Sequence, residues 1–139
     1  MAVSSIKLPA DTPAGIICIW RDGYTYKISK SSAGVTTYSI LTKNGALKYE
    51  KNYKDGKEDG VQKEWYEYGK GTLRYEQNYK DGQYDGVQKA WRADGTPLCE
   101  YNYKDWKMDG VQKEWHPNGA VWSEKNYKDG ELISEEEEG

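Results

Sequence analysis

Apolar and polar residues alternate in short segments along most of the chain. Three segments near the N-terminus, "IICIWR" (16–21), "YTYKIS" (24–29) and "VTTYSIL" (35–41), are rich in β-branched and aromatic residues, with turn residues between them. A period of two is typical of β-strands, and Asp22-Gly23 favours a tight hairpin. No segment keeps a 3.6-residue apolar period over the length of a helix. The pattern predicts an all-β protein.

One string of residues recurs in the second part of the chain. "NYKDGKEDGVQKEW" at 52–65 returns in close form at 78–91 and 102–115, and a fourth copy, "NYKDGELISEEEE", begins at 126 and then diverges. Asparagine opens each copy, at intervals of 26, 24 and 24 residues. Asp-Gly supplies one turn of each copy, and a glycine seven residues before each asparagine supplies the other. We predict a continuous antiparallel meander of tandem hairpins, each of about 24 residues.

These patterns divide the chain into three parts. Residues 1–45 are predicted to form a β cap without repeats, residues 46–134 the tandem hairpins, and residues 135–139 an acidic tail. Within each hairpin the alternation predicts one aromatic face and one polar face. In the first copy we expect the polar face to receive Glu50, Asn52, Gln62 and Glu64.

Composition excludes several classes of function. The net charge is −3 with no basic cluster, so we expect no nucleic-acid partner. Cys18 and Cys99 match no metal or redox spacing, and we expect no cofactor and no metal site. The longest N-terminal apolar run, "GIICIW", is too short for a signal core or a membrane span. We expect a cytoplasmic protein, and the oligomeric state is left open.

Catalytic motifs are missing from the sequence. There is one histidine, and there is no G-x-S-x-G, no phosphate-binding loop and no C-x-x-C. The glutamates at 50, 76, 100 and 124 recur at one position of the repeat, so we expect a ladder or pairing with the repeated lysine of "VQK". The sequence predicts a protein that is not an enzyme.

The repeats resemble the MORN-repeat variant of bacterial proteins. Its pattern is matched in the first copy by eight residues: Gly45, Leu47, Glu50, Tyr53, Asp55, Gly56, Gly60 and Trp65. The resemblance covers roughly residues 43–131, and this chain departs from the pattern at Trp106, where a turn glycine is expected, and at Pro97, where a strand leucine is expected. It implies an elongated, curved meander with a binding role. Bacterial proteins of this variant are often grouped with antitoxin or immunity proteins, and other members act as scaffolds or contact membranes.

Residues that differ between the copies are the better candidates for recognition. Recurring tyrosines and tryptophans are expected to form the frame, whereas Tyr, Trp, Arg, His and Met at varied positions are typical of interfaces. The candidate partner-binding residues are Tyr66, Tyr84, Arg92, Trp106, Met108, His116 and Trp122. The leading hypothesis is a non-catalytic inhibitor of the immunity or antitoxin type that masks a toxin or effector protein. The alternatives are a structural scaffold or membrane-associated repeat protein, and a small-ligand binder.

Overall fold

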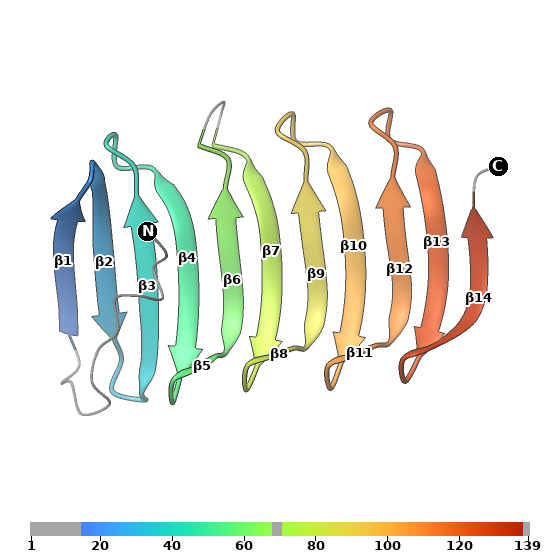
Figure 1. Ribbon diagram of the computed structural model, residues 1–139, viewed down its shortest axis with the longest axis horizontal. Coiled ribbons are helices and arrows are strands. Elements are labelled where there is room, and N and C mark those ends of the chain that lie inside the picture. The colour runs from blue at the N-terminus through green and yellow to red at the C-terminus, as the bar shows by residue number, and fades with distance from the viewer. Residues whose placement is uncertain (1–14, 68–70, 138–139) are drawn as a thin grey trace.

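The repeats and the N-terminal segment form one sheet. The structure is a computed structural model that describes residues 15–67 and 71–137. Within these ranges the regular elements are fourteen β-strands, all joined in a single antiparallel sheet. Neighbouring strands follow the chain order from one end of the sheet to the other, so the molecule is an open, elongated meander (Figure 1). The predicted all-β meander of tandem hairpins is confirmed.

The apolar core of the described residues lies at the N-terminal end of the sheet. The three strands there are those predicted from the alternation: β1 (Gly15–Arg21), β2 (Tyr24–Lys30) and β3 (Val35–Leu41). Tyr26 and Ile28 of β2 are buried beside Tyr38 and Ile40 of β3, with which they are paired across the strands. Tyrosines of β4 pack against this cluster, so the sheet continues without a break from the cap into the repeats.

Each of the first three copies contributes one long strand, one two-residue strand and one six-residue strand. They are β4 (Leu47–Lys54), β5 (Lys57–Glu58) and β6 (Gly60–Trp65); β7 (Leu73–Lys80), β8 (Gln83–Tyr84) and β9 (Gly86–Trp91); and β10 (Pro97–Lys104), β11 (Lys107–Met108) and β12 (Gly110–Trp115). The first turn has φ values of 51° at Asp55 and 79° at Gly56. Positive φ at both central residues is the geometry expected of Asp-Gly in a two-residue hairpin.

A buried glutamine side chain replaces part of the backbone ladder in each of these copies. Between β4 and β6 the two strands separate at Asp59 and Gly60, and the amide of Gln62 lies in the gap. Its oxygen accepts from the N–H of Asn52 at 2.8 Å, and its nitrogen donates to the C=O of Asn52 at 2.7 Å. The Asn52 amide donates to the C=O of Val61 at 2.6 Å. The amide of Gln62 thus takes the place of a peptide group, and Gln88 and Gln112 do the same with Asn78 and Asn102.

The fourth copy shows what happens without this glutamine. It consists of β13 (Val121–Lys128) and β14 (Glu131–Glu137), and it has Ile133-Ser134 where the other copies have Asp-Gly, and Glu136 where they have glutamine. After one irregularity, Asn126 is paired directly with Ser134 and the two strands remain in backbone register. Strand β14 therefore extends to Glu137, into the segment 135–139 that the sequence predicted as an acidic tail.

The predicted division into an aromatic and a polar face is wrong. Beside the two-residue turn Tyr53 lies opposite Glu58, and after a two-residue shift of register at Asp59 and Gly60 Tyr49 lies opposite Glu64. Directly opposed residues share a face, which places Gln62 and Glu64 among the tyrosines. Both are buried, with 2% and 5% of their surface exposed. The aromatic face is therefore also the face that holds the buried amides and carboxylates.

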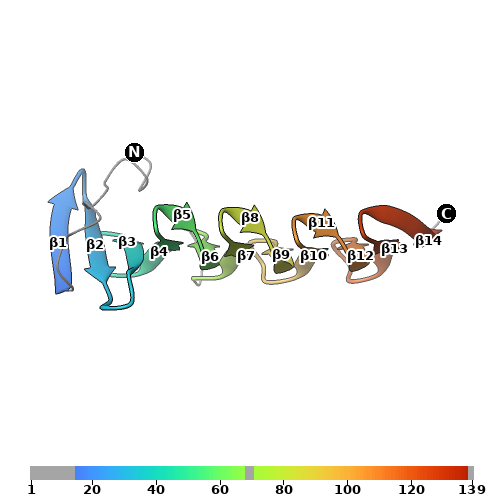
Figure 2. The ribbon, with the colours of Figure 1, turned by 90° about the horizontal axis from the view of Figure 1, so that it is seen from below.

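The sheet is a single layer along the repeats. Seen from below, β5, β8 and β11 rise toward one side of the strands that they follow, and β14 curves the same way (Figure 2). No helix in the part of the chain that the structure describes is long and apolar enough to cross a membrane.

Candidate functional site

The two-residue turns form one long edge of the molecule, which we call the tip edge. It contains residues 55–56, 81–82, 105–106 and 129–130, and it lies along the bottom of Figure 1. Each tip is joined to the copy before it. The N–H groups of Gly82, Trp106 and Gly130 donate to the C=O groups of Glu58, Tyr84 and Met108 at 2.8, 3.1 and 2.8 Å. The tips therefore stack in a fixed row.

A recurring aspartate adds a second bond at each junction of the tip edge. The carboxylate of Asp85 accepts from the N–H of Asp105 at 3.3 Å, and Asp59 and Asp109 accept in the same way from the next tip. Because each carboxylate accepts from a backbone N–H of the next copy, these aspartates help to hold neighbouring copies together. No group of three or more metal-ligating side chains occurs among the residues that the structure describes.

The longer turns form the opposite edge, which we call the loop edge. Here the side chains that follow the first two repeated tryptophans bond to the next copy. The Tyr66 hydroxyl donates to the C=O of Trp91 at 2.7 Å. The Arg92 guanidinium donates to the C=O of Trp115 at 2.6 Å and to that of Pro97 at 2.7 Å. Two different side chains therefore cap the same carbonyl position in successive copies.

The seven candidate binding residues fall on both edges. Tyr84, Trp106 and Met108 belong to the tip edge, whereas Tyr66, Arg92, His116 and Trp122 belong to the loop edge. The two groups lie at opposite ends of the strands, so they do not form one patch. Tyr66 and Arg92 already have partners within the chain, which gives them a role in holding the copies together. Their role in partner binding stays a prediction, as does that of the other five.

Trp122 and His116 lie together on the loop edge. Their ring centroids are 5.9 Å apart, and Trp122 remains 51% exposed. The first copy has Lys48 in the position of Trp122, where its ammonium group is 2.8 Å from Glu67. A solvated ion pair in one copy is thus replaced by an exposed aromatic surface in the last.

Trp106 is the most exposed aromatic residue among those described. It stands where the other three tips have glycine, its φ is 63°, and 58% of its surface is exposed. A side chain with a Cβ in this left-handed region costs on the order of 1 kcal/mol. The ring gains little burial in return. An exposed tryptophan at a strained turn is a typical feature of a recognition site rather than of a frame.

Tyr84 connects the second and third copies beside Trp106. Its ring centroid lies 5.0 Å from that of Tyr79 and 5.1 Å from that of Tyr103, and its hydroxyl accepts from the Gln77 amide at 3.1 Å. The other copies have Glu58, Met108 and Leu132 at this position. Tyr84 therefore extends a row of tyrosine rings up to the tip where Trp106 stands.

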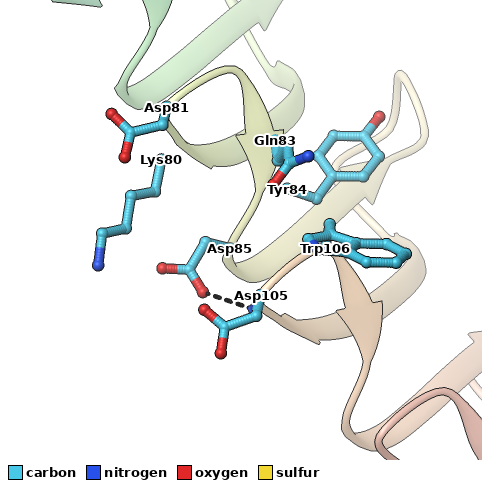
Figure 3. A pocket seen from close by; sticks show the side chains of 7 residues that line it. All are labelled: Lys80, Asp81, Gln83, Tyr84, Asp85, Asp105 and Trp106. Atoms are coloured by element: carbon cyan, nitrogen blue, oxygen red, sulfur yellow. Dashed lines mark hydrogen bonds between the residues drawn. The ribbon is translucent and has the colours of Figure 1, made fainter.

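A cleft opens between these two tips. It has a volume of about 230 Å³ and is lined by Lys80, Asp81, Gln83, Tyr84, Asp85, Asp105 and Trp106. In Figure 3 the rings of Tyr84 and Trp106 lie on one side of the cleft and the three carboxylates on the other. The sequence singled out the two aromatic residues but missed the aspartates as part of the same site. The signal was the pair "YDG" and "KDW", which stacking of adjacent copies brings together.

Charges elsewhere on the sheet are paired between copies. Lys63, Lys89 and Lys113 lie 3.7, 3.6 and 3.2 Å from Glu76, Glu100 and Glu124, so the predicted pairing with the repeated lysine is confirmed for three of the four repeated glutamates. These pairs are half exposed and contribute about 0–1 kcal/mol each. The buried Glu64 accepts from the Tyr75 hydroxyl at 3.2 Å and lies 3.1 Å from the Arg74 guanidinium. Burial, followed by the nearby Glu64 charge, raises the pKa of Tyr75 to about 12.

Comparison with known proteins agrees with this geometry. The family described as MORN repeat variant matches residues 108–129, which run from β11 through β12 and β13 to the last tip. No curated protein matches the chain. MORN repeats are generally non-catalytic and bind proteins or membrane lipids. The segment 108–129 is therefore similar to the MORN repeat variant, and the asparagine–glutamine bonds and lysine–glutamate pairs of the earlier copies show that these copies share the fold of the matched segment.

Proposed function

We propose that the protein is a non-catalytic protein-binding module that masks a partner effector, as an inhibitor of the immunity or antitoxin type. The observation that carries the proposal is the exposure of Trp106 and Trp122 on a frame whose own polar groups are satisfied. No buried side-chain nitrogen or oxygen among the described residues lacks a hydrogen-bond partner. Large aromatic residues that contribute little to internal packing are typical of interface hot spots.

The bonds between copies support a preformed binding surface. Backbone and aspartate bonds join each copy to the next along the tip edge, and tyrosine and arginine bonds join the first three copies along the loop edge. A surface that is ordered before binding loses little conformational entropy on association, and this favours tight masking of a folded partner. The immunity or antitoxin role rests on the resemblance of the repeats to the bacterial variant.

Affinity capture from a lysate of the native host tests this proposal. The wild-type protein and two variants, Trp106→Gly and Trp122→Lys, serve as bait, because each substitution installs a residue that another copy has at that position. We expect one stoichiometric protein whose enzymatic activity falls on adding the wild-type chain, with reduced capture by at least one variant. Lys57→Gln, at an exposed position of the first tip, is the matched control and should capture normally. Equal capture by all four proteins would contradict the proposal.

A scaffold is the second candidate function, and one observation favours it. Leu132 and Ile133 are 47% and 65% exposed on β14, a strand that pairs with β13 alone. An apolar edge strand with unpaired backbone groups is a site for pairing with another chain. Light scattering after size-exclusion chromatography distinguishes the two. A monomer at all concentrations contradicts the scaffold, and Ile133→Lys should dissolve an assembly built through this edge.

A further inference from the structure

Two departures from the repeat meet at one junction of the tip edge. Trp106 replaces the turn glycine of the third tip, and Tyr84 occupies the position that the other copies fill with Glu58, Met108 and Leu132. The two residues are 22 positions apart in the sequence, yet the N–H of Trp106 donates directly to the C=O of Tyr84. The remaining contacts of this junction repeat those of the other junctions. The departures therefore change the surface here and keep the backbone and aspartate bonds of the junction, while Tyr84 adds ring contacts with Tyr79 and Tyr103.

The cleft between the two tips has the size of a site for one side chain. Its volume of about 230 Å³ is smaller than the roughly 300–1,000 Å³ of sites for metabolites and drug-sized ligands. Figure 3 shows Gln83 beside Tyr84, on the aromatic side of the cleft. A long side chain with a planar polar end can lie against the rings and reach the carboxylates.

The charges that line the cleft select a cation. Asp81, Asp85 and Asp105 face Lys80 as the one cationic lining residue. The aromatic side has the same preference, because the faces of tryptophan and tyrosine rings attract ammonium and guanidinium groups. The chain itself shows this attraction, since the Lys107 ammonium lies 5.2 Å from the centre of the Trp106 ring.

We infer that this cleft takes an arginine side chain of the protein partner. The guanidinium group stacks on the exposed face of Trp106 beside Tyr84, and its N–H groups donate to the carboxylates of Asp85 and Asp105. Arginine fits better than lysine because its planar end can stack on a ring and donate in two directions at once. Asp85 keeps its bond to the Asp105 backbone through one oxygen, which leaves the other for the incoming group. This inference rests on the proposed function, because it names the chemistry by which the partner is recognised.

A blocked peptide tests the site without the partner. The probe is acetyl-Gly-Arg-Gly-amide, and its comparison is the same peptide with citrulline, which has the shape of arginine without the charge. Indole N–H signals of the six tryptophans are followed by NMR, and that of Trp106 is identified by its loss in Trp106→Gly. We expect a saturable shift of the Trp106 signal with the arginine peptide and affinity roughly fivefold or more weaker for citrulline.

Three substitutions make the assignment specific. Asp85→Asn keeps an acceptor for the Asp105 N–H but removes the charge, so it should weaken binding, whereas Asp59→Asn at the preceding junction should have no effect. Lys107→Gln installs the residue found at Gln83 and removes the cation that competes for the Trp106 ring, so it should tighten binding. Equal binding of the two peptides, shifts confined to other tryptophans, or no response to Asp85→Asn would each overturn the inference.

The peptide experiment tests the arginine site and the capture experiment tests the masking function, so either claim can be contradicted without the other. A captured partner that binds normally to Trp106→Gly but poorly to Trp122→Lys leaves the masking function in place and overturns the arginine site as its means of recognition. A specific arginine response without any captured and inhibited partner supports the cleft and contradicts the masking function.

Discussion

Replacing Gln62 by alanine should destabilise the protein more than any exposed glutamine substitution. The Gln62 side chain is 2% exposed, and its amide satisfies both the N–H and the C=O of Asn52, at 2.8 and 2.7 Å. The C=O of Asn52 also accepts from the N–H of Asp59 at 3.0 Å, so the substitution leaves the N–H of Asn52 without a partner in the gap between β4 and β6. An unsatisfied buried group costs about 1–3 kcal/mol. Because this N–H is the one backbone group left unsatisfied, we expect a loss of about 1–3 kcal/mol.

Urea unfolding followed by circular dichroism and tryptophan fluorescence measures this loss. A domain of ordinary stability, about 5–15 kcal/mol, would lose a substantial fraction, and the midpoint should fall with little change in slope. Gln83→Ala is the control, because Gln83 is exposed and surface substitutions usually stay within about 0.5 kcal/mol. A loss at Gln62 no larger than that at Gln83 would refute the role of the amide as a substitute peptide group.

Two further predictions concern contacts between copies. Tyr75 ionises near pH 12 in the folded chain and near pH 10 when unfolded, so its contribution to stability is present below pH 10 and is lost as the pH rises to 12. Tyr75→Phe should therefore make urea midpoints fall less steeply between pH 10 and 12, and an unchanged slope would contradict this. Arg92→Leu removes the donors to the carbonyls of Trp115 and Pro97 and should cost about 1–3 kcal/mol. Thermal unfolding checks it, and Arg92→Lys should recover only part of the loss.

The order of strands was predictable because it depends on local signals. Asp55-Gly56 has the dihedral angles that this pair favours, and Gly45 at the other turn has a φ of 80°. Counting outward from the two-residue turn pairs Tyr49 with Gln62, and the register shift at Asp59 and Gly60 moves its partner by two residues to Glu64. Because the shift is even, the residues that face the tyrosines are the same in both registers. The prediction of the two faces failed because residues were assigned to a face by their hydrophobicity and not by the strand pairing that the turn imposes. A buried carboxylate among tyrosines does not show in a hydropathy pattern.

The role of Gln62 was harder to foresee. It depends on the separation of two strands at Gly60 and on a backbone target ten positions away, and neither has a motif of its own. Sequence variation between the copies was taken as a sign of partner binding, and this was misleading at the position that follows the repeated tryptophan. Tyr66 and Arg92 differ in chemistry, yet each bonds to the carbonyl of the tryptophan in the next copy. At the tip edge, by contrast, the variable residues Tyr84 and Trp106 do come together at a cleft.

The bonds along the tip edge also fix the spacing between successive copies. The carboxylate of Asp85 accepts a hydrogen bond from the N–H of Asp105, and that of Asp109 accepts one from the N–H of Asp129. The junctions between copies therefore use the same donor and acceptor positions. Excision of residues 78–101 brings Asn102 into the place of Asn78 and rejoins Asp59 to a tip of the same geometry. Such a shortened chain should fold with one copy fewer, and the distance between the cap and the last strand should fall by the width of one copy. Selection for a larger or smaller partner can therefore act by copying or deleting units, without any redesign of the contacts within them.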